Sequence, residues 1–350
     1  MRLISSFVFI AILFSSCKKD DPTISGNVPL SNGMMVLCEG LFQQNNSSIS
    51  YVNFNNASVI NDFFFKTSER ILGDTGNDIQ RYGGKIYAVV NGSSTIEVIS
   101  GVTGLSIKQI PMVEGGVPKQ PRSVAVYQDK ILVSCYDGFV DVIDTTSLEV
   151  EQRILVGSNP EGLAVFNDYL YVANSGGLNF PNVDSTVSVV NLTTFSEELK
   201  VTVGKNPSGV AVDAAGDVYV ISRGDYNTIP SRLNKINPMT YQVTQFPFDA
   251  SSITKMNGNF LIGYADFSTG DNHVGLFNPV SDVLTNPTYV DVSSVQTVYG
   301  ITYNPALDKI FVSDAKDFVT TGEVLEYDGS GAFLTSYSVG LNPSKVVFYE

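Results

Sequence analysis

The chain contains no tryptophan, one histidine and three cysteines among its 350 residues. With His273 as the single histidine, a metal site built from several histidines is excluded, and a Ser-His-Asp triad would have to use that residue. The sequence also lacks a CxxC pair, a glycine-rich phosphate loop and a GxSxG elbow. We therefore expect a protein that is not an enzyme and that uses neither a metal nor a cofactor.

Basic residues are scarce as well. There are 21 Lys and Arg against 35 Asp and Glu, which gives a formal net charge of −14. Because nucleic-acid binding depends on neutralising phosphates with Lys and Arg, we expect no nucleic-acid partner. Hydrophobic residues make up 43% of the chain and charged residues 16%, and there are 30 glycines. This composition favours β-structure with many turns.

The longest apolar run, at residues 3–14, is too short to span a bilayer. It is typical of an export signal, and the FSSC sequence that ends at Cys17 resembles a bacterial lipobox. The following KKDD, residues 18–21, resembles the export tag of surface lipoproteins of Bacteroidetes. These resemblances imply a signal peptide over 1–17, a lipid on Cys17 and a tether over 18–32. We expect the protein in the outer membrane facing outward, held by its lipid only; an ordinary secretory signal is the alternative.

One phrase recurs along the chain. VGSNPEGLAV at 156–165 returns as VGKNPSGVAV at 203–212 and as VGLNPSKVVF at 339–348, and KQPRSVAV at 119–126 is a degenerate copy. Intervals of about 40–47 residues are typical of repeat architectures. Within one repeat we expect four strands, at 162–166, 169–174 and 186–191, and one ending at 203–204.

The same template fits five further segments, 77–113, 121–157, 207–248, 252–292 and 299–340. Residues 33–66 offer three strands, the third of them INDFFF, without an innermost one, and 344–349 offer an innermost strand alone. Joined, the two ends make a seventh repeat, and ring closure removes free sheet edges. The sequence predicts an all-β, seven-bladed β-propeller over 33–350, closed by strand 344–349. Cys38 and Cys135 fall at equivalent positions two blades apart, so we expect two buried free thiols.

Loops that do not repeat indicate where a ligand binds. In five adjacent blades the loop between the second and third strands is long, and each such loop holds an aromatic residue and a carboxylate. Long loops in compact domains are usually functional, and aromatics with convergent polar groups line ligand pockets. The alternative is that the aromatics pack each loop onto its own blade. We predict a ligand-binding rim formed by Glu39, Phe42, Arg122, Tyr136, Asn174, Phe180, Arg223, Tyr226, Asp266, Phe267, Asp317 and Phe318.

Residues that enter the innermost strands face the same rim: Asn77, Arg122, Glu161, Ser208 and Tyr299. Arg122 and Arg223 could hold a carboxylate or a phosphate of a ligand. Alternatively, carboxylates of neighbouring blades satisfy them. Calcium on rim carboxylates has no regular ligand spacing to support it.

The sequence YVAN at 171–174, preceded by NPEGLAV, resembles the YVTN and YncE-like propellers over the whole mature chain. The stretches 36–53, 300–318 and 342–350 resemble a group of Bacteroidetes surface lipoproteins that includes the cobalamin-binding BtuG proteins. The resemblance implies a non-catalytic protein that captures a corrinoid and passes it to a TonB-dependent outer-membrane transporter, monomeric apart from that partner. Two alternatives remain: a propeller that binds a glycan or a partner protein, and a lyase or hydrolase that uses His273.

Overall fold

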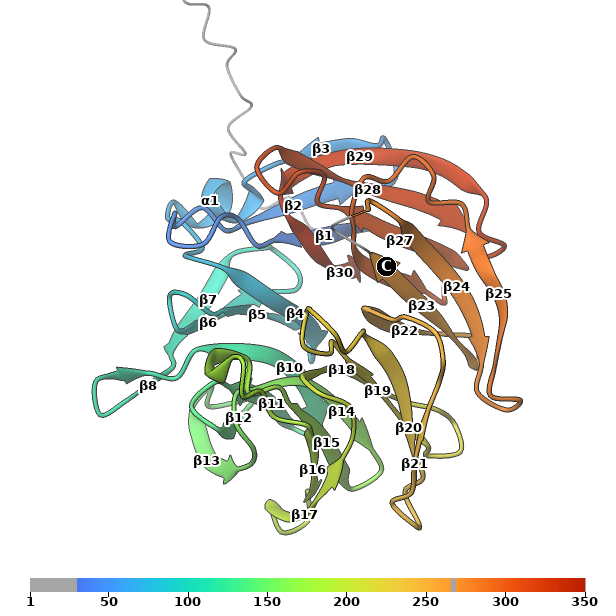
Figure 1. Ribbon diagram of the computed structural model, residues 1–350. Coiled ribbons are helices and arrows are strands. Elements are labelled where there is room, and N and C mark those ends of the chain that lie inside the picture. The colour runs from blue at the N-terminus through green and yellow to red at the C-terminus, as the bar shows by residue number, and fades with distance from the viewer. Residues whose placement is uncertain (1–29, 266–268, 350) are drawn as a thin grey trace, which may run out of the picture.

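The computed structural model describes residues 30–265 and 269–349. In these ranges the chain forms seven four-stranded antiparallel sheets arranged around a central axis, and one two-stranded sheet (Figure 1). The predicted all-β, seven-bladed propeller is confirmed. The signal peptide with Cys17, and the tether up to residue 29, lie outside the described residues, as do 266–268 and 350.

The first three blades come from the N-terminal half, with β30 joining from the C-terminus. Blade 1 contains β30 (Pro343–Tyr349), β1 (Gly33–Cys38), β2 (Ser48–Asn53) and β3 (Ser58–Ile60). Blade 2 contains β4 (Gly76–Tyr82), β5 (Lys85–Val90), β6 (Thr95–Ser100) and β7 (Ser106–Pro111). Blade 3 contains β10 (Pro121–Tyr127), β11 (Lys130–Cys135), β12 (Phe139–Asp144) and β13 (Val150–Leu155).

The other four blades follow in chain order, each from its innermost strand outward. Blade 4 contains β14 (Pro160–Phe166), β15 (Tyr169–Asn174), β16 (Thr186–Asn191) and β17 (Ser196–Thr202). Blade 5 contains β18 (Pro207–Val212), β19 (Val218–Ser222), β20 (Arg232–Ile236) and β21 (Val243–Gln245). Blade 6 contains β22 (Ser252–Met256), β23 (Asn259–Ala265), β24 (Asn272–Asn278) and β25 (Val283–Val290). Blade 7 contains β26 (Val298–Asn304), β27 (Lys309–Asp314), β28 (Thr321–Asp328) and β29 (Phe333–Leu341).

The C-terminal strand closes the ring as predicted. β30 pairs antiparallel with β1, with Gly33 opposite Tyr349 and Leu37 opposite Lys345. The innermost strand of blade 1 thus comes from the opposite end of the chain to its other strands. This join completes the seventh four-stranded sheet and ties the two ends of the chain together.

The hydrophobic core lies between the blades. Seven clusters of buried side chains each combine residues of two neighbouring blades; one of them joins Leu37 of blade 1 to Ile86 of blade 2. Each sheet is therefore covered on both faces, which explains why the second and third strands read as nearly continuous apolar runs.

Two segments differ from the sequence prediction. The expected strand INDFFF is wrong beyond Ile60, because β3 ends there and the short helix α1 (Phe63–Ser68) follows. Phe63 and Phe64 are buried, and the Phe63 ring lies 5.4 Å from that of Tyr51, so packing onto blade 1 outweighs the strand preference of the aromatic run. The hairpin of β8 (Val113–Glu114) and β9 (Val117–Pro118) was not predicted; it turns at Gly115 and Gly116.

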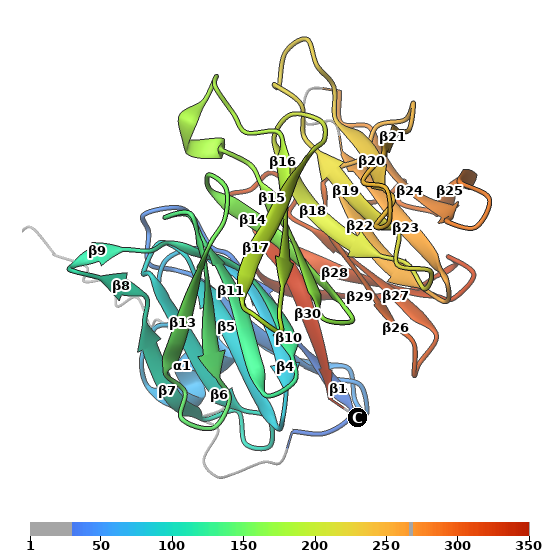
Figure 2. The same ribbon diagram turned by 90° about the horizontal axis from the view of Figure 1, so that it is seen from below.

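The loops between second and third strands all lie at one end of the ring, which we call the loop face. Figure 2 shows the loops after β15, with the 3-10 helix η1 (Gly177–Asn179), and after β19 rising there, away from the C-terminus. The described chain begins at the other end, where the Leu30 amide donates to the Val102 carbonyl oxygen at 3.0 Å. Val102 belongs to a turn between third and fourth strands, which lies at the end opposite the loop face.

Candidate functional site

A cavity of about 1090 Å³ opens on the loop face at the centre of the ring. All seven innermost strands contribute to its wall, and the loop of residues 223–231 adds to it on the blade 5 side. The polar and charged residues of the wall come mainly from the starts of those strands: Asn77, Asp78, Arg122, Glu161, Ser208, Ser252, Tyr299, Ser344 and Lys345.

The repeated phrase places these side chains. Its Asn residues, Asn159, Asn206 and Asn342, adopt positive φ values of 44°, 55° and 54°, a conformation that Asn tolerates better than most residues. After the following proline the pairing with the second strand skips: Pro160 lies opposite Asn174, but the next pair joins Leu163 to Val172. A bulge of this kind re-aims side chains, and it leaves the residue after the proline, Glu161, facing the cavity.

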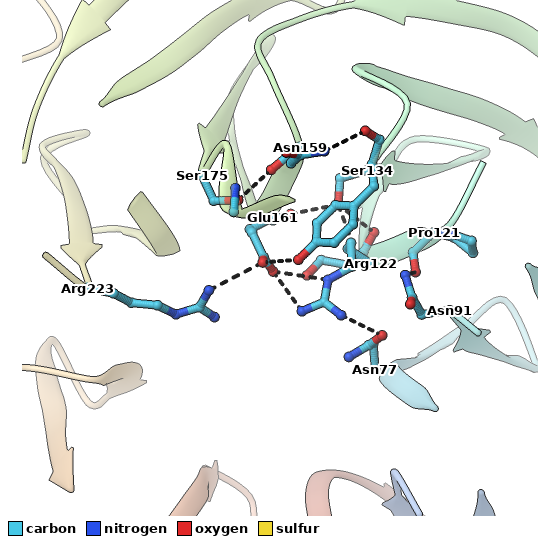
Figure 3. Close-up of polar contacts among 12 residues, drawn as sticks. Asn77, Asn91, Pro121, Arg122, Ser134, Asn159, Glu161, Ser175 and Arg223 are labelled. Carbon is cyan, nitrogen blue, oxygen red and sulfur yellow. Dashed lines mark hydrogen bonds and ion pairs between the residues drawn. The ribbon is translucent and has the colours of Figure 1, made fainter. Parts of the chain in front are cut away.

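One side of the wall is a buried ion cluster centred on Glu161 (Figure 3). Arg122 donates to Glu161 Oε2 through Nε at 3.2 Å and Nη2 at 3.0 Å, and Arg223 Nη1 donates to Oε1 at 3.3 Å. The Tyr136 hydroxyl also donates to Oε1, at 2.5 Å, and the Arg122 guanidinium lies 4.7 Å from the Tyr136 ring centre. Arg122 Nη1 donates to Asn77 Oδ1 at 2.8 Å. We call Arg122, Tyr136, Glu161 and Arg223 the Glu161 cluster.

The electrostatics of the Glu161 cluster favour its charged form. Burial alone would raise the pKa of Glu161, but Arg122 and Arg223 outweigh burial and lower that pKa to about 2. Burial opposes the charge of Arg122, yet Glu161 raises the pKa of that guanidinium above its ordinary value. Burial and the Glu161 charge both raise the pKa of Tyr136, so it remains a neutral donor. The cluster is ionised and internally paired at neutral pH.

The side of the wall next to blades 1, 2 and 7 is paired far less completely. Tyr299 donates to Glu39 Oε2 at 2.7 Å, and burial raises the pKa of Glu39 to about 7. Burial also raises the pKa of Asp78, although the Lys345 charge and the amides of Val124 and Ile79, which each donate to Asp78 at 2.9 Å, oppose that rise. Lys345 is exposed to the cavity and has no hydrogen-bond or ion-pair partner among the residues that the structure describes. We call Glu39, Asp78, Tyr299 and Lys345 the Lys345 side.

Four of the predicted rim residues line the cavity: Glu39, Arg122, Arg223 and Tyr226. Tyr136 stands behind the wall and acts through Glu161. The two arginines pair with a carboxylate of a neighbouring blade, which is the second of the alternatives that the sequence left open.

The other described rim residues lie outside the cavity wall. Asn174 is fully buried; it accepts from the Gly157 amide at 3.0 Å and donates to Ser188 at 2.9 Å, so it supports the blade rather than facing a ligand. The Asp317 carboxylate accepts from the amides of Val319 and Thr320 and therefore folds its own loop. Asp266 and Phe267 lie outside the described residues.

Three of the described rim aromatics are exposed, whereas Phe318 packs onto its own blade. Phe42, Phe180 and Tyr226 are 69%, 57% and 70% exposed. Phe180 of blade 4 and Tyr226 of blade 5 approach each other, with ring centres 6.4 Å apart. Phe318 is half-buried against Tyr299, with ring centres 5.6 Å apart.

The sequence reasoning did not single out Lys345 and Asp78. Asp78 directly follows Asn77, which the sequence did identify. Lys345 stands in the last copy of the phrase where two other copies have Gly162 and Gly209. Variation inside an otherwise repeated phrase was the signal that could have identified Lys345.

His273, the residue of the enzyme alternative, is exposed, and its ring stacks on Tyr264 with centres 6.1 Å apart. Within the described ranges no three His, Cys, Asp or Glu residues are grouped so as to hold a metal ion. Cys38 and Cys135 are buried free thiols, as predicted, and burial raises the pKa of Cys38 to about 12. Across residues 30–265 and 269–349, no helix has the length and apolar character needed to cross a membrane.

Solved structures similar to this chain share its fold. A quinonprotein alcohol dehydrogenase-like protein from Bacteroides thetaiotaomicron matches with a TM-score of 0.69 at 14% identity, covering 93% of this chain and 80% of that one. Hydrazine synthase of Kuenenia stuttgartiensis matches with a TM-score of 0.60 at 14% identity, covering 77% and 88%. The computationally designed Ika8 protein matches with a TM-score of 0.56 at 14% identity, covering 88% of each chain.

No curated protein matches the chain. A family model described as "Domain of unknown function (DUF5074)" matches residues 32–330, which includes blades 2 to 6 completely and three of the four strands of blades 1 and 7. This protein, a seven-bladed propeller with a charged cavity on the loop face, therefore belongs to the DUF5074 family.

Proposed function

We propose that this protein is a non-catalytic binding protein that captures a nutrient in the loop-face cavity, that the nutrient is a corrinoid such as cobalamin, and that the protein passes it to a TonB-dependent outer-membrane transporter. The observation that carries the proposal is the cavity itself: about 1090 Å³, walled by charged and hydrogen-bonding side chains and bordered by exposed aromatics.

The size and chemistry of the cavity suit a large amphipathic ligand. Pockets for small molecules usually enclose about 300–1,000 Å³, so this cavity, of about 1090 Å³, is slightly larger than that range. Cobalamin is large and rich in amides, which need both donors and acceptors. The wall supplies donors on Arg223 and Lys345 and acceptors on Glu39 and Asp78, while Tyr226 offers an apolar face.

The pairing within the wall supports binding rather than catalysis. Glu39 has a pKa near that of a general base. Its hydrogen-bond partner is the Tyr299 hydroxyl, whose pKa burial raises further, so the pair lacks an activated nucleophile. The proposal predicts that His273→Ala leaves ligand binding unchanged.

The position of the N-terminal segment is compatible with a lipid anchor at Cys17. The described chain begins near Val102, at the end opposite the loop face. Attachment to a membrane upstream of Leu30 would therefore leave the cavity open to the medium.

The proposal is tested by gel filtration of residues 22–350, which retain the complete closed ring, mixed with cyanocobalamin. We expect visible absorbance to co-elute with the protein at micromolar concentration. Tyr226→Ala should reduce the co-eluting absorbance, whereas Phe333→Ala, at an exposed aromatic of β29 away from the cavity, should not. Absence of co-elution would contradict the proposal that the ligand is cobalamin. Co-purification of a TonB-dependent transporter with the lipidated protein tests the transfer step.

A further inference from the structure

Lys345 and Arg223, two cations of the cavity wall, each have hydrogen-bond donor groups without a partner among the described residues. Lys345 has no partner for its ammonium among the described residues. Arg223 uses Nη1 to reach Glu161, and its Nε and Nη2 have no acceptor within the described ranges. The Arg223 side chain is 36% exposed, so these groups are accessible from the cavity.

The residue at the position of Lys345 differs from blade to blade. In blades 4 and 7 the equivalent residues are Gly162 and Gly300, where an added Cβ would lie 2.3 Å and 2.1 Å from a backbone oxygen of the next blade. The equivalent positions of blades 2 and 3 carry Asp78 and Ser123, and that of blade 1 carries Lys345, so glycine is not required there throughout the ring. Lys345 is thus not needed to build the repeat.

The carboxyl groups of the wall leave the spare donors of Arg223 and Lys345 without a direct partner, and Lys345 attracts Glu39 and Asp78 without an ion pair to either. Arg122, Arg223 and Lys345 face the carboxyl groups of Glu161, Glu39 and Asp78. Glu161 is ionised, but it is committed to the two arginines. Burial disfavours the ionised forms of Glu39 and Asp78. Asp249 also lines the cavity, and it pairs with Arg232.

We infer that the cavity binds an anionic group of its ligand, a carboxylate or a phosphate, between Lys345 and Arg223. The inference rests on one part of the proposed function, namely that this cavity is the ligand-binding site. A phosphate is present in cobalamin as a phosphodiester, so the inference states which part of that ligand enters the cavity. The net charge of −14 opposes entry of an anion, but charges beyond about 10 Å are largely screened at ordinary salt.

Binding of the anion should weaken as the pH rises through about 7, since Glu39 then adds a negative charge to the wall beside Lys345. The charged and titratable groups around Glu39 are Tyr299, Arg122, Glu161 and Lys345, with Asp78 beside Lys345. Tyr299, Arg122 and Glu161 keep their charge states near neutral pH, because the pKa of Tyr299 and of Arg122 is raised and that of Glu161 is lowered.

The test uses benzene-1,3,5-tricarboxylate as the anion and benzene-1,3,5-tricarboxamide as its neutral counterpart, titrated by calorimetry at constant ionic strength. Carboxylates of this kind remain ionised above pH 6, so the probe does not titrate in the range examined. We expect the tricarboxylate to bind and the tricarboxamide to bind at least tenfold more weakly. Equal binding of the two compounds, or no binding of the tricarboxylate, would overturn the inference.

Lys345→Gln is the decisive variant, because its side chain is exposed and its replacement does not disturb the ring. A hydrogen bond to a charged group contributes about 1.5–3 kcal/mol, so the variant should bind the tricarboxylate about tenfold more weakly or worse. Lys205→Gln is the matched control: Lys205 is exposed on the same face and lies outside the cavity wall. An equal loss in both variants would mean that only the overall charge matters, which contradicts the inference.

The pH arm compares the protein with Glu39→Gln between pH 6 and pH 8. Affinity for the tricarboxylate should fall with pH in the former and stay level in the latter. A level response in both, or an equal fall in both, contradicts the role of Glu39 beside the bound anion.

Competition by dimethyl phosphate and by acetate, both monoanions, distinguishes the two sources of negative charge. Stronger displacement by one of them identifies the preferred group, and displacement by neither counts against the site. If the tricarboxylate binds and cyanocobalamin does not, the anion site stands and the cobalamin assignment fails. If cyanocobalamin binds equally to the protein and to Lys345→Gln, the cobalamin assignment stands and the inference fails.

Discussion

The two sides of the cavity wall contain similar residue types, but they differ in how completely the charged side chains are paired and in the direction of the carboxyl pKa shift. In the Glu161 cluster every carboxylate oxygen has a partner, and the carboxyl pKa is lowered to about 2. On the Lys345 side the carboxyl of Glu39 has a pKa raised to about 7, and the lysine is unpaired within the described ranges. The same phrase of sequence thus builds a structural ion cluster in one part of the ring and a site with open binding capacity in another. A charged residue in the central cavity is therefore not by itself evidence of ligand binding. The evidence is a donor group that has no partner within the protein.

The largest expected effect comes from breaking the Glu161 cluster. Glu161→Gln leaves Arg122 and Arg223 close together without a counter-charge. Removing one partner of a buried ion pair typically costs about 3–5 kcal/mol, and we expect a loss of unfolding free energy in that range, measured by urea denaturation at pH 7. Glu39→Gln is the control and should cost far less, since Gln keeps the hydrogen bond to Tyr299. Equal losses would mean that the two sides do not differ.

The pH dependence of stability should have opposite signs on the two sides. The Glu161 pKa is lowered from 4.5 to about 2, so its contribution is full above about 4.5 and is lost as the pH falls toward 2. The Glu39 pKa is raised from 4.5 to about 7, so the folded state binds more protons than the unfolded state in that range, and stability falls as the pH rises from 4.5 to 7.

Urea denaturation across pH 4.5 to 7.5 checks the second of these effects. In the Glu39→Gln variant the decline between pH 4.5 and 7 should become shallower than in the unmodified protein. An unchanged slope would show that Glu39 titrates near its ordinary value.

A smaller effect should appear in the reactivity of the two buried cysteines. Cys135 immediately precedes Tyr136 of the Glu161 cluster, and Cys38 immediately precedes Glu39, at the equivalent place in another blade. Because a buried thiol reacts only when its surroundings open, labelling with a thiol reagent under native conditions reports the opening of each side. Glu161→Gln should accelerate labelling of Cys135 more than that of Cys38, as read by mass spectrometry of the labelled peptides. Equal acceleration would indicate global rather than local opening.

The smallest stability effect should come from the rim. Phe180 is 57% exposed, so Phe180→Ala should change the unfolding free energy by no more than about 0.5 kcal/mol. If the proposed function holds, the same variant should still lower cyanocobalamin binding, since it removes the partner of Tyr226. A large loss of stability with unchanged binding would make Phe180 a packing residue.

Much of the fold follows from the sequence because the repeated phrase carries its own geometry. Asn159 supplies the positive φ, Pro160 starts the innermost strand, and the apolar run after it packs between blades. The helix at Phe63 was missed since three consecutive phenylalanines favour a strand locally, whereas the burial of Phe63 and Phe64, with Phe63 against Tyr51, depends on tertiary packing. The sequence of the hairpin at Val113 contains a Gly-Gly pair, which is typical of a turn. The hairpin was not predicted because the four-strand repeat has no additional pair of strands between two blades.

The site was only partly predictable. That Arg122 and Glu161 would face one end of the ring follows from their place after the proline. That Arg122 and Glu161 would pair between neighbouring blades, and that Lys345 would have no partner within the described ranges, depends on side-chain distances that the sequence does not contain. Asn174 illustrates the limit in the other direction: it ends a strand at the rim, but its side chain turns inward and bonds within its own blade.

A crystal structure of the protein with benzene-1,3,5-tricarboxylate tests the central claim most directly. We predict that a carboxylate of the bound compound lies within hydrogen-bond distance of both Lys345 Nζ and the Arg223 guanidinium, with the Glu161 cluster unchanged behind it. A compound bound at the outer surface of the blades, or one that displaces Arg122 from Glu161 while Lys345 remains without a contact, would contradict the account.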